Sequence, residues 1–194
     1  MKRILCMLIF FLASQVLQAG TISGKSKCQG LADHGNAVVY AERFPRENIS
    51  PPLDTVVLDQ INLTFVPHVL PVLVGTTVSF PNSDELRHNV FSFSPPKLFN
   101  LGIYPRGTLR QVIFDQPGEV VLLCNIHMEM SAYVLVLETP YFTVTPKDGS
   151  YSLKNLSAGK YKLSVWHERC KPVSQPIEIK GTEEIPFSVE LTRR

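Results

Sequence analysis

The chain is organised around residues 118–137, which read Gly-Glu-Val-Val-Leu-Leu-Cys-Asn-Ile-His-Met-Glu-Met-Ser-Ala-Tyr-Val-Leu-Val-Leu. Apolar and β-branched residues at both ends of this stretch predict two strands joined by a short loop. The loop carries Cys124, His127 and Met130 within seven residues. A thiolate, an imidazole and a thioether are soft ligands, and a loop that presents all three suits copper.

A copper site of this kind needs a second imidazole, because its usual set is two histidines and one cysteine with a weak axial sulfur. His88 is the candidate, since it precedes a strand-like run and follows the turn-rich residues 81–84. Met128 competes with Met130 for the axial position. Side chains alternate along an extended chain, so Met128 is expected to point away from the site and to form an apolar rim with Ile126.

Each of these residues also has an ordinary structural interpretation. Cys124 alone would be read as a small buried core residue, and His88 alone as a half-buried strand histidine. Zinc could use the same cysteine and histidines, but a methionine is a poor zinc ligand. The combination and its spacing favour copper over these alternatives.

The same residues resemble the cupredoxins, the blue-copper family. The matching pieces are Gly75–Asn82, then His88-Asn89-Val90, then Cys124-x2-His127-x2-Met130. The resemblance covers roughly residues 54–138 and implies a Greek-key β-sandwich. It also implies that Asn89 hydrogen-bonds across to the cysteine loop and braces the ligands, with a related part for Asn125.

The loop spacing departs from part of that family. Plastocyanin-like members usually have a longer gap between the second histidine and the methionine than the two residues found here. The short gap looks more like the binuclear copper domains of terminal oxidases, which need two cysteines in the loop. This loop has only Cys124, so the expected site holds one copper ion, bound by His88, Cys124, His127 and Met130.

The N-terminus has the pattern of a secretory signal peptide. Met1-Lys2-Arg3 is followed by an apolar run over 4–17 and then by Gln18-Ala19-Gly20, which predicts a signal peptide over 1–19 with cleavage after Ala19. The apolar run is short for a membrane span, so no span is expected after cleavage. We therefore expect export to the periplasm.

Charge and cysteine content agree with an exported protein. Without Lys2 and Arg3 the chain has 17 basic and 17 acidic residues, and it contains no basic run, so nucleic-acid binding is not expected. Cys6 leaves with the signal peptide. If Cys124 binds metal, Cys28 and Cys170 remain, in a compartment where disulfides persist, and pairing them leaves no odd thiol.

Short β-branched runs and fifteen prolines predict an all-β protein. Within the copper-binding region, 61–66 is expected to be one strand and 95–106 a loose excursion. The tail after Thr139 has a different pattern, with an Asp148-Gly149 turn and a second turn at Gly159 between alternating strands. It resembles the carboxypeptidase-regulatory, transthyretin-like β-sandwich.

The tail has too few strands for such a sandwich by itself. We therefore expect a split sandwich made of 20–47 and 140–194, with the cupredoxin domain at 54–138 inserted between its second and third strands. Cys28 and Cys170 would then lie in one domain. The alternative is a continuous domain at each end, with 21–47 as an added edge of the cupredoxin.

Three functions are compatible with these features. The first is an exported one-electron carrier that docks on a redox protein. The second is copper storage or delivery to a copper-accepting protein, and the third is a binding module with a structural or vestigial metal site. Neither a nucleophile–base pair nor paired carboxylates stand out, so the protein is not expected to be an enzyme.

Overall fold

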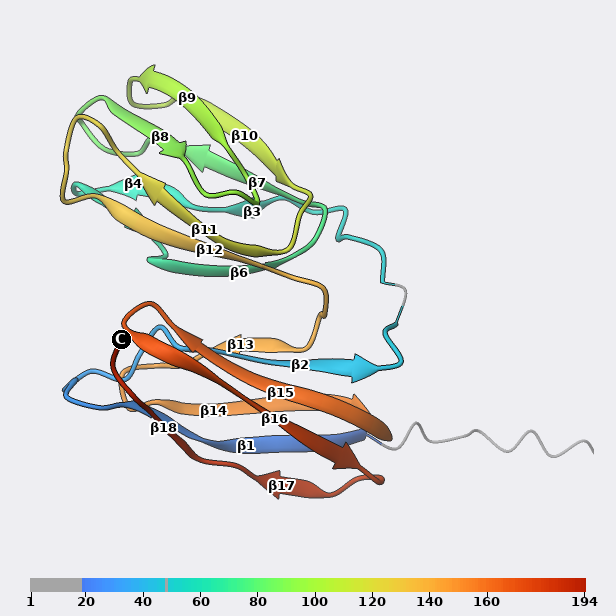
Figure 1. Ribbon diagram of the computed structural model, residues 1–194. Coiled ribbons are helices and arrows are strands. Elements are labelled where there is room, and N and C mark those ends of the chain that lie inside the picture. Colours follow the sequence, from blue (N-terminus) through green and yellow to red (C-terminus); the bar gives the residue numbers. More distant parts are fainter. Residues whose placement is uncertain (1–18, 48) are drawn as a thin grey trace, which may run out of the picture.

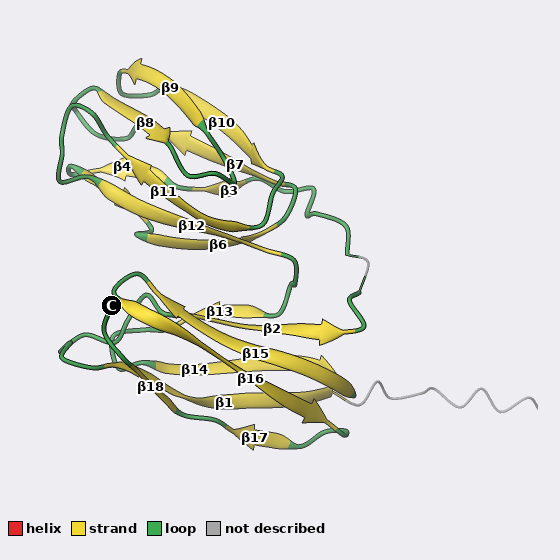
Figure 2. Cartoon of the chain, viewed as in Figure 1, coloured by secondary structure: helices red, strands yellow, loops and turns green. Residues whose placement is uncertain are grey.

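The computed structural model describes residues 19–47 and 49–194. This part of the chain forms two stacked β-sandwiches (Figure 1). It contains eighteen strands and no helix (Figure 2), so the predicted all-β class is confirmed. Accordingly, within 19–47 and 49–194 there is no apolar helix of membrane-spanning length. The predicted signal peptide lies outside the described residues except for Ala19, which begins the first strand.

The first sandwich is built from the central part of the chain. Its larger sheet has the strand order β6-β12-β11-β8-β9, its smaller sheet has the order β10-β7-β3, and β4 and β5 form a separate hairpin. The strands are β3 (Val56–Val57), β4 (Asp59–Ile61), β5 (Thr64–Val66), β6 (Val69–Leu73), β7 (Thr76–Pro81), β8 (His88–Ser92), β9 (Phe99–Tyr104), β10 (Leu109–Phe114), β11 (Gly118–Leu123) and β12 (Ser131–Leu137).

Two local predictions for this sandwich are wrong. Residues 61–66 are not one strand, because the chain turns at Asn62 and Leu63, both with positive φ, and separates β4 from β5. Residues 95–106 are not a loose excursion, because 99–104 form β9 beside β8. The apolar–polar alternation of β9 is interrupted by Gly102, which obscures its strand character.

The second sandwich combines the two ends of the described chain. One sheet has the order β14-β1-β17, with β18 also pairing with β1, and the other has the order β13-β2-β15-β16. The chain leaves this sandwich after β2 and returns at β13, and its transthyretin-like character stays a prediction. The strands are β1 (Ala19–Cys28), β2 (Val38–Phe44), β13 (Phe142–Val144), β14 (Ser150–Ser157), β15 (Gly159–His167), β16 (Cys170–Ile179), β17 (Glu184–Pro186) and β18 (Val189–Leu191).

A disulfide joins Cys28 at the end of β1 to Cys170 at the start of β16, with the two Cα atoms 6.3 Å apart. Both cysteines belong to the buried core of the second sandwich. The bond closes a loop that contains the whole first sandwich, because 142 positions separate the two residues.

The two sandwiches share an apolar seam. On β12, Val134 packs into the first core, whereas its neighbours Tyr133 and Leu135 pack into the seam. Trp166 of β15 lies on the opposite side, where its ring is 5.6 Å from that of Tyr133 and its indole N–H donates to Glu119 at 2.9 Å. These strands have continuous apolar runs in their sequences because both of their faces are buried.

Removing the disulfide should weaken the second sandwich. Replacing Cys28 and Cys170 together by serine is expected to lower the free energy of unfolding by about 2–5 kcal/mol, because the unfolded chain regains the freedom of a long loop. Urea unfolding of metal-free protein measures this. Cys124→Ser is the control, since it removes a buried sulfur without opening a loop. An unchanged urea midpoint for the double variant would contradict the expectation.

Candidate metal centre

The predicted ligand loop is the connection between β11 and β12. Leu123 pairs with Ser131, so residues 124–130 form the turn of this hairpin. The turn is closed by backbone bonds: the Cys124 N–H donates to the Met130 carbonyl at 3.3 Å, and the Met130 N–H donates to the His127 carbonyl at 3.0 Å. These bonds fold the loop back on itself and bring its first and last residues together.

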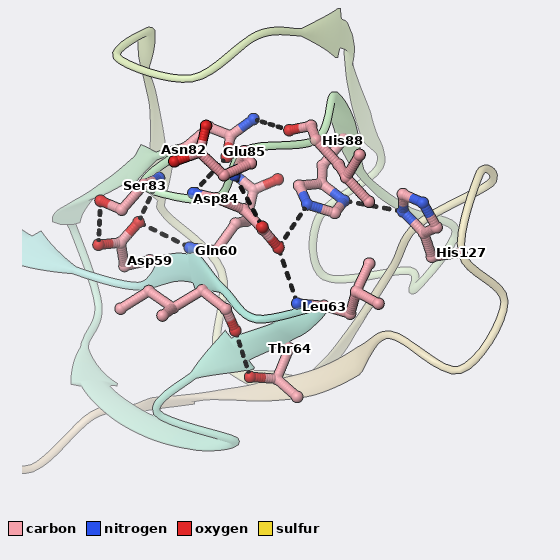
Figure 3. Close-up of polar contacts among 12 residues, drawn as sticks. Asp59, Gln60, Leu63, Thr64, Asn82, Ser83, Asp84, Glu85, His88 and His127 are labelled. Carbon is pink, nitrogen blue, oxygen red and sulfur yellow. Dashed lines mark hydrogen bonds and ion pairs between the residues drawn. The ribbon is translucent and has the colours of Figure 1, made fainter.

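His88 reaches the loop because β8 lies beside β11. The two strands are antiparallel, with Leu123 opposite Phe91, so the start of β8 and the end of β11 meet at one end of the sheet. The His88 side chain is fully buried. Its Nδ1 lies 2.9 Å from Nδ1 of His127 (Figure 3), and the nitrogens and the Cys124 sulfur all lie within 4.8 Å of one another.

This donor set fits a metal ion. An imidazole nitrogen lies about 2.0–2.1 Å from a bound ion, and two such nitrogens on a tetrahedral ion are about 3.3 Å apart. The observed 2.9 Å between the two Nδ1 atoms is close to that separation, so little movement is needed. A free, buried cysteine sulfur beside the rings provides the soft donor that suits copper.

The two methionines of the loop have opposite environments. Met130 is 1% exposed and packs in the same core cluster as Cys124, whereas Met128 is 91% exposed. Met130 is therefore the methionine held on the inner side of the loop, where a thioether could complete the donor set. Met128 and Ile126 are on the solvent side.

Asn89 connects β8 to the ligand loop. Its side-chain amide donates to Oδ1 of Asn125 at 3.1 Å. Asn89 is buried and Asn125 is exposed. The contact crosses from the strand that carries His88 to the residue directly after Cys124, so it opposes separation of the two ligand-bearing segments.

One functional residue was missed by the sequence analysis. Asp84 Oδ2 lies 3.0 Å from Nε2 of His88, on the side of the ring opposite to His127 (Figure 3). The backbone N–H of Leu63 donates to the same oxygen at 2.7 Å and is the main cause of a lowered pKa of the Asp84 carboxyl. In the sequence, the feature that could have indicated this contact is that Asp84 precedes His88 by four positions.

A second cluster of possible donors has a different explanation. Atoms of Cys28, His167 and Cys170 also lie within 4.8 Å of one another. The two sulfurs are joined in the disulfide, and Nδ1 of His167 accepts the backbone N–H of Arg169 at 3.1 Å. Burial lowers the pKa of His167. Neither sulfur is a free thiolate in this arrangement.

The solvent side of the metal centre is a shallow apolar hollow. It is lined by His127, Leu86, Arg87, Ile103 and Ile126. The three aliphatic side chains are between 41% and 52% exposed. His127 is the only one of the three close donors that reaches this surface, because Cys124 and His88 are buried. The hollow therefore connects the centre to solvent through one imidazole.

Several solved structures of copper proteins are similar to the chain. It is 30% identical to a copper-containing nitrite reductase (NirK) from Thermus scotoductus SA-01 over 48% of its own length, spans 24% of that protein, and gives a TM-score of 0.41. A purple cupredoxin from Nitrosopumilus maritimus is 23% identical over 42% of this chain and 99% of that chain, with a TM-score of 0.39.

The amicyanin of Paracoccus versutus is 19% identical over 50% of this chain and 98% of its own, with a TM-score of 0.41. No protein-family model and no curated protein matches the chain. All three TM-scores are below 0.5.

The amide contact between Asn89 and Asn125 should be measurable as a coupling free energy. In a double-mutant cycle with Asn89→Ala and Asn125→Ala, the two residues are expected to couple by about 0.5–1.5 kcal/mol, as one intramolecular hydrogen bond does. Denaturant unfolding of the four metal-free proteins provides the measurement. Additive losses of stability would show that the contact contributes nothing.

Proposed function

We propose that this protein is an exported, periplasmic one-electron carrier that binds a single copper ion through His88, Cys124, His127 and Met130. The observation that carries the proposal is that the two Nδ1 atoms lie 2.9 Å apart and that a ring nitrogen of each histidine and the Cys124 sulfur lie within 4.8 Å of one another. Bound copper would supply a centre that gains or loses one electron.

The residues of the chain hold the donors before any ion is present. Cys124 and Met130 are fixed by the backbone bonds of the loop, and His88 by its strand and by Asp84. Donors placed by a sheet move little when the charge at their centre changes. Rigid placement of the donors keeps the reorganisation energy small, and a small reorganisation energy favours rapid electron transfer.

Burial of the donors favours a carrier over a catalyst. A catalytic metal site keeps a coordination position open to substrate. Here Cys124 is 4% exposed and Met130 1% exposed, while the His88 side chain is 0% exposed. Four protein donors would leave no free position, so a substrate has no direct access to the centre.

The hollow beside His127 is proposed as the docking surface for a redox protein. Its aliphatic lining can exclude water from a small contact, while Arg87 adds one polar group. Electron-transfer encounters are usually small and transient. An electron would enter or leave through the imidazole of His127, which extends from the donor cluster to this surface.

Absorption and paramagnetic-resonance spectra test the metal site. The protein loaded with Cu(II) is expected to bind one equivalent and to show an intense visible band from the cysteine thiolate. Cys124→Ser should abolish the band, because the thiolate is lost. Met128→Leu is the matched control, since Met128 is 91% exposed and should leave band and stoichiometry unchanged. Full copper binding and an unchanged spectrum in Cys124→Ser would sink the proposal.

Electron self-exchange between copper-loaded molecules tests the docking surface. Ile126→Glu should slow exchange by at least about tenfold, because a contact between two copies would bury a charge and bring like charges together. Line broadening in mixtures of oxidised and reduced protein measures the rate. Ile113→Glu is the control, since Ile113 is also exposed, at 54% on β10 against 41% for Ile126, but does not line the hollow. Equal rates for the two variants would place the exchange surface elsewhere.

Copper delivery is the alternative that one observation favours. Met128 offers an exposed thioether two positions from Met130, where reduced copper could be passed outward. A carrier should retain its copper against a chelator while it cycles reversibly by one electron. A colourless protein that loses copper to the chelator within minutes would favour delivery.

A further inference from the structure

We infer that Asp84 is a positioning residue of the copper centre: its carboxylate holds the His88 ring with Nδ1 free for the metal and favours the oxidised ion over the reduced one. The inference rests on the proposed function. It concerns a residue that would not itself bind the metal, and it stands on the contacts around Asp84 and His88.

The Asp84 carboxylate faces two backbone N–H groups and one ring nitrogen of His88. Oδ2 accepts the backbone N–H of Leu63 at 2.7 Å and lies 3.0 Å from Nε2 of His88, while Oδ1 accepts the N–H of Glu85 at 2.8 Å. A carboxylate anion has acceptor capacity for all three, whereas a protonated acid would direct its O–H toward a donor. The Asp84 side chain is 11% exposed and that of His88 is fully buried, so water screens this contact weakly.

This contact determines which ring nitrogen carries the proton. If Nε2 of His88 donates to Asp84, the neutral ring has a bare Nδ1. That bare nitrogen lies 2.9 Å from Nδ1 of His127. In the metal-free protein the proton between the two rings therefore resides on His127.

The segment that carries Asp84 is fastened on its own side. Asn82 accepts the Asp84 N–H at 3.0 Å and donates to the Leu86 carbonyl at 2.9 Å, which closes the turn before β8. Ser83 donates to Asp59 at 2.7 Å, which ties the turn to β4 (Figure 3). The carboxylate is therefore held in place by the same turn that leads into the ligand strand.

The third anchor comes from the tip of the β4–β5 hairpin. Asn62 and Leu63 have φ values of 49° and 60°, the two left-handed positions of a tight hairpin. Asn suits this conformation, but a leucine is unfavourable there. The conformation directs the Leu63 N–H to Asp84 Oδ2. Backbone strain of this kind persists where the surrounding structure enforces it, and it is concentrated at functional sites.

An anion behind a ligating imidazole affects the two oxidation states differently. The carboxylate makes the ring a stronger donor, and its negative charge interacts more favourably with the more highly charged ion. Glu85 and Asp59 provide equal charges nearby. Glu85 pairs with Arg106, and Asp59 accepts a hydrogen bond from Ser83; within the described residues neither carboxylate is bonded to His88.

The test compares Asp84→Asn with two controls. Glu85→Gln removes one negative charge next to Asp84 without removing the contact to His88, and Asp59→Asn weakens the same turn. In wild type and in all variants, competition titrations with Cu(I) and Cu(II) and voltammetry give affinities and reduction potential. Long-range proton–nitrogen spectra of histidine-labelled, metal-free protein give the tautomer of His88 without any copper.

Asp84→Asn is expected to weaken Cu(II) binding about tenfold more than Cu(I) binding. For a one-electron couple this raises the potential by about 59 mV. Both controls should stay near wild type. Metal-free wild type should show the His88 proton on Nε2, and Asp84→Asn should show a mixture of tautomers, while Asp84→Glu should retain part of the Nε2 form.

Several results would overturn the inference. These are an unchanged potential in Asp84→Asn, equal shifts in Asp84→Asn and Glu85→Gln, or a wild-type His88 with its proton on Nδ1. If Asp84→Asn fails to fold, the tautomer of His88 in the metal-free wild-type protein still tests the inference. Absence of copper binding by the wild type would instead overturn the proposed function, and the metal-free spectrum separates that result from a failure of the inference.

Discussion

The pairing of β8 with β11 is the constraint on which the metal centre depends. His88 and Cys124 are 36 positions apart, and only the antiparallel register that sets Leu123 opposite Phe91 brings their side chains to one end of the sheet. Burying two imidazole nitrogens and a sulfur together is unfavourable, because their lone pairs do not attract one another unless a proton or a metal lies between them. Sheet hydrogen bonds, the closed loop and the apolar core hold them there, and the result is a cluster of donors that could hold a metal ion.

The second sandwich follows from the outer face of the same sheet. Val69, Leu135 and Leu137 project from β6 and β12 away from the first core and would form an exposed apolar patch on an isolated sandwich. The strands β2, β13 and β15 cover this patch, and Trp166 of β15 belongs to the same buried cluster. The disulfide between Cys28 and Cys170 then joins the segment before the first sandwich to the segment after it, within the second sandwich.

The sequence was informative where chemistry or periodicity is local. The spacing of Cys124, His127 and Met130 predicts a ligand loop without any knowledge of the fold, and continuous apolar runs predict strands. Parallel pairing of β17 and β18 with β1 joins segments more than 160 positions apart, and nothing local specifies it. Asp84 was missed for a related reason: its effect depends on the N–H of Leu63, whose left-handed backbone cannot be expected from a leucine.

Closure of the centre has opposite consequences for electrons and for ions. In the proposed carrier, electrons would pass through an imidazole edge, so a donor set with only His127 near the surface would still exchange them with a docked partner. A copper ion would have to be released by Cys124, Met130 and His88, all of which are buried and held by the loop bonds or by Asp84. Each contact that stiffens the cage therefore favours the carrier and hinders delivery. The exposed thioether of Met128 is not subject to this argument, because it lies outside the cage.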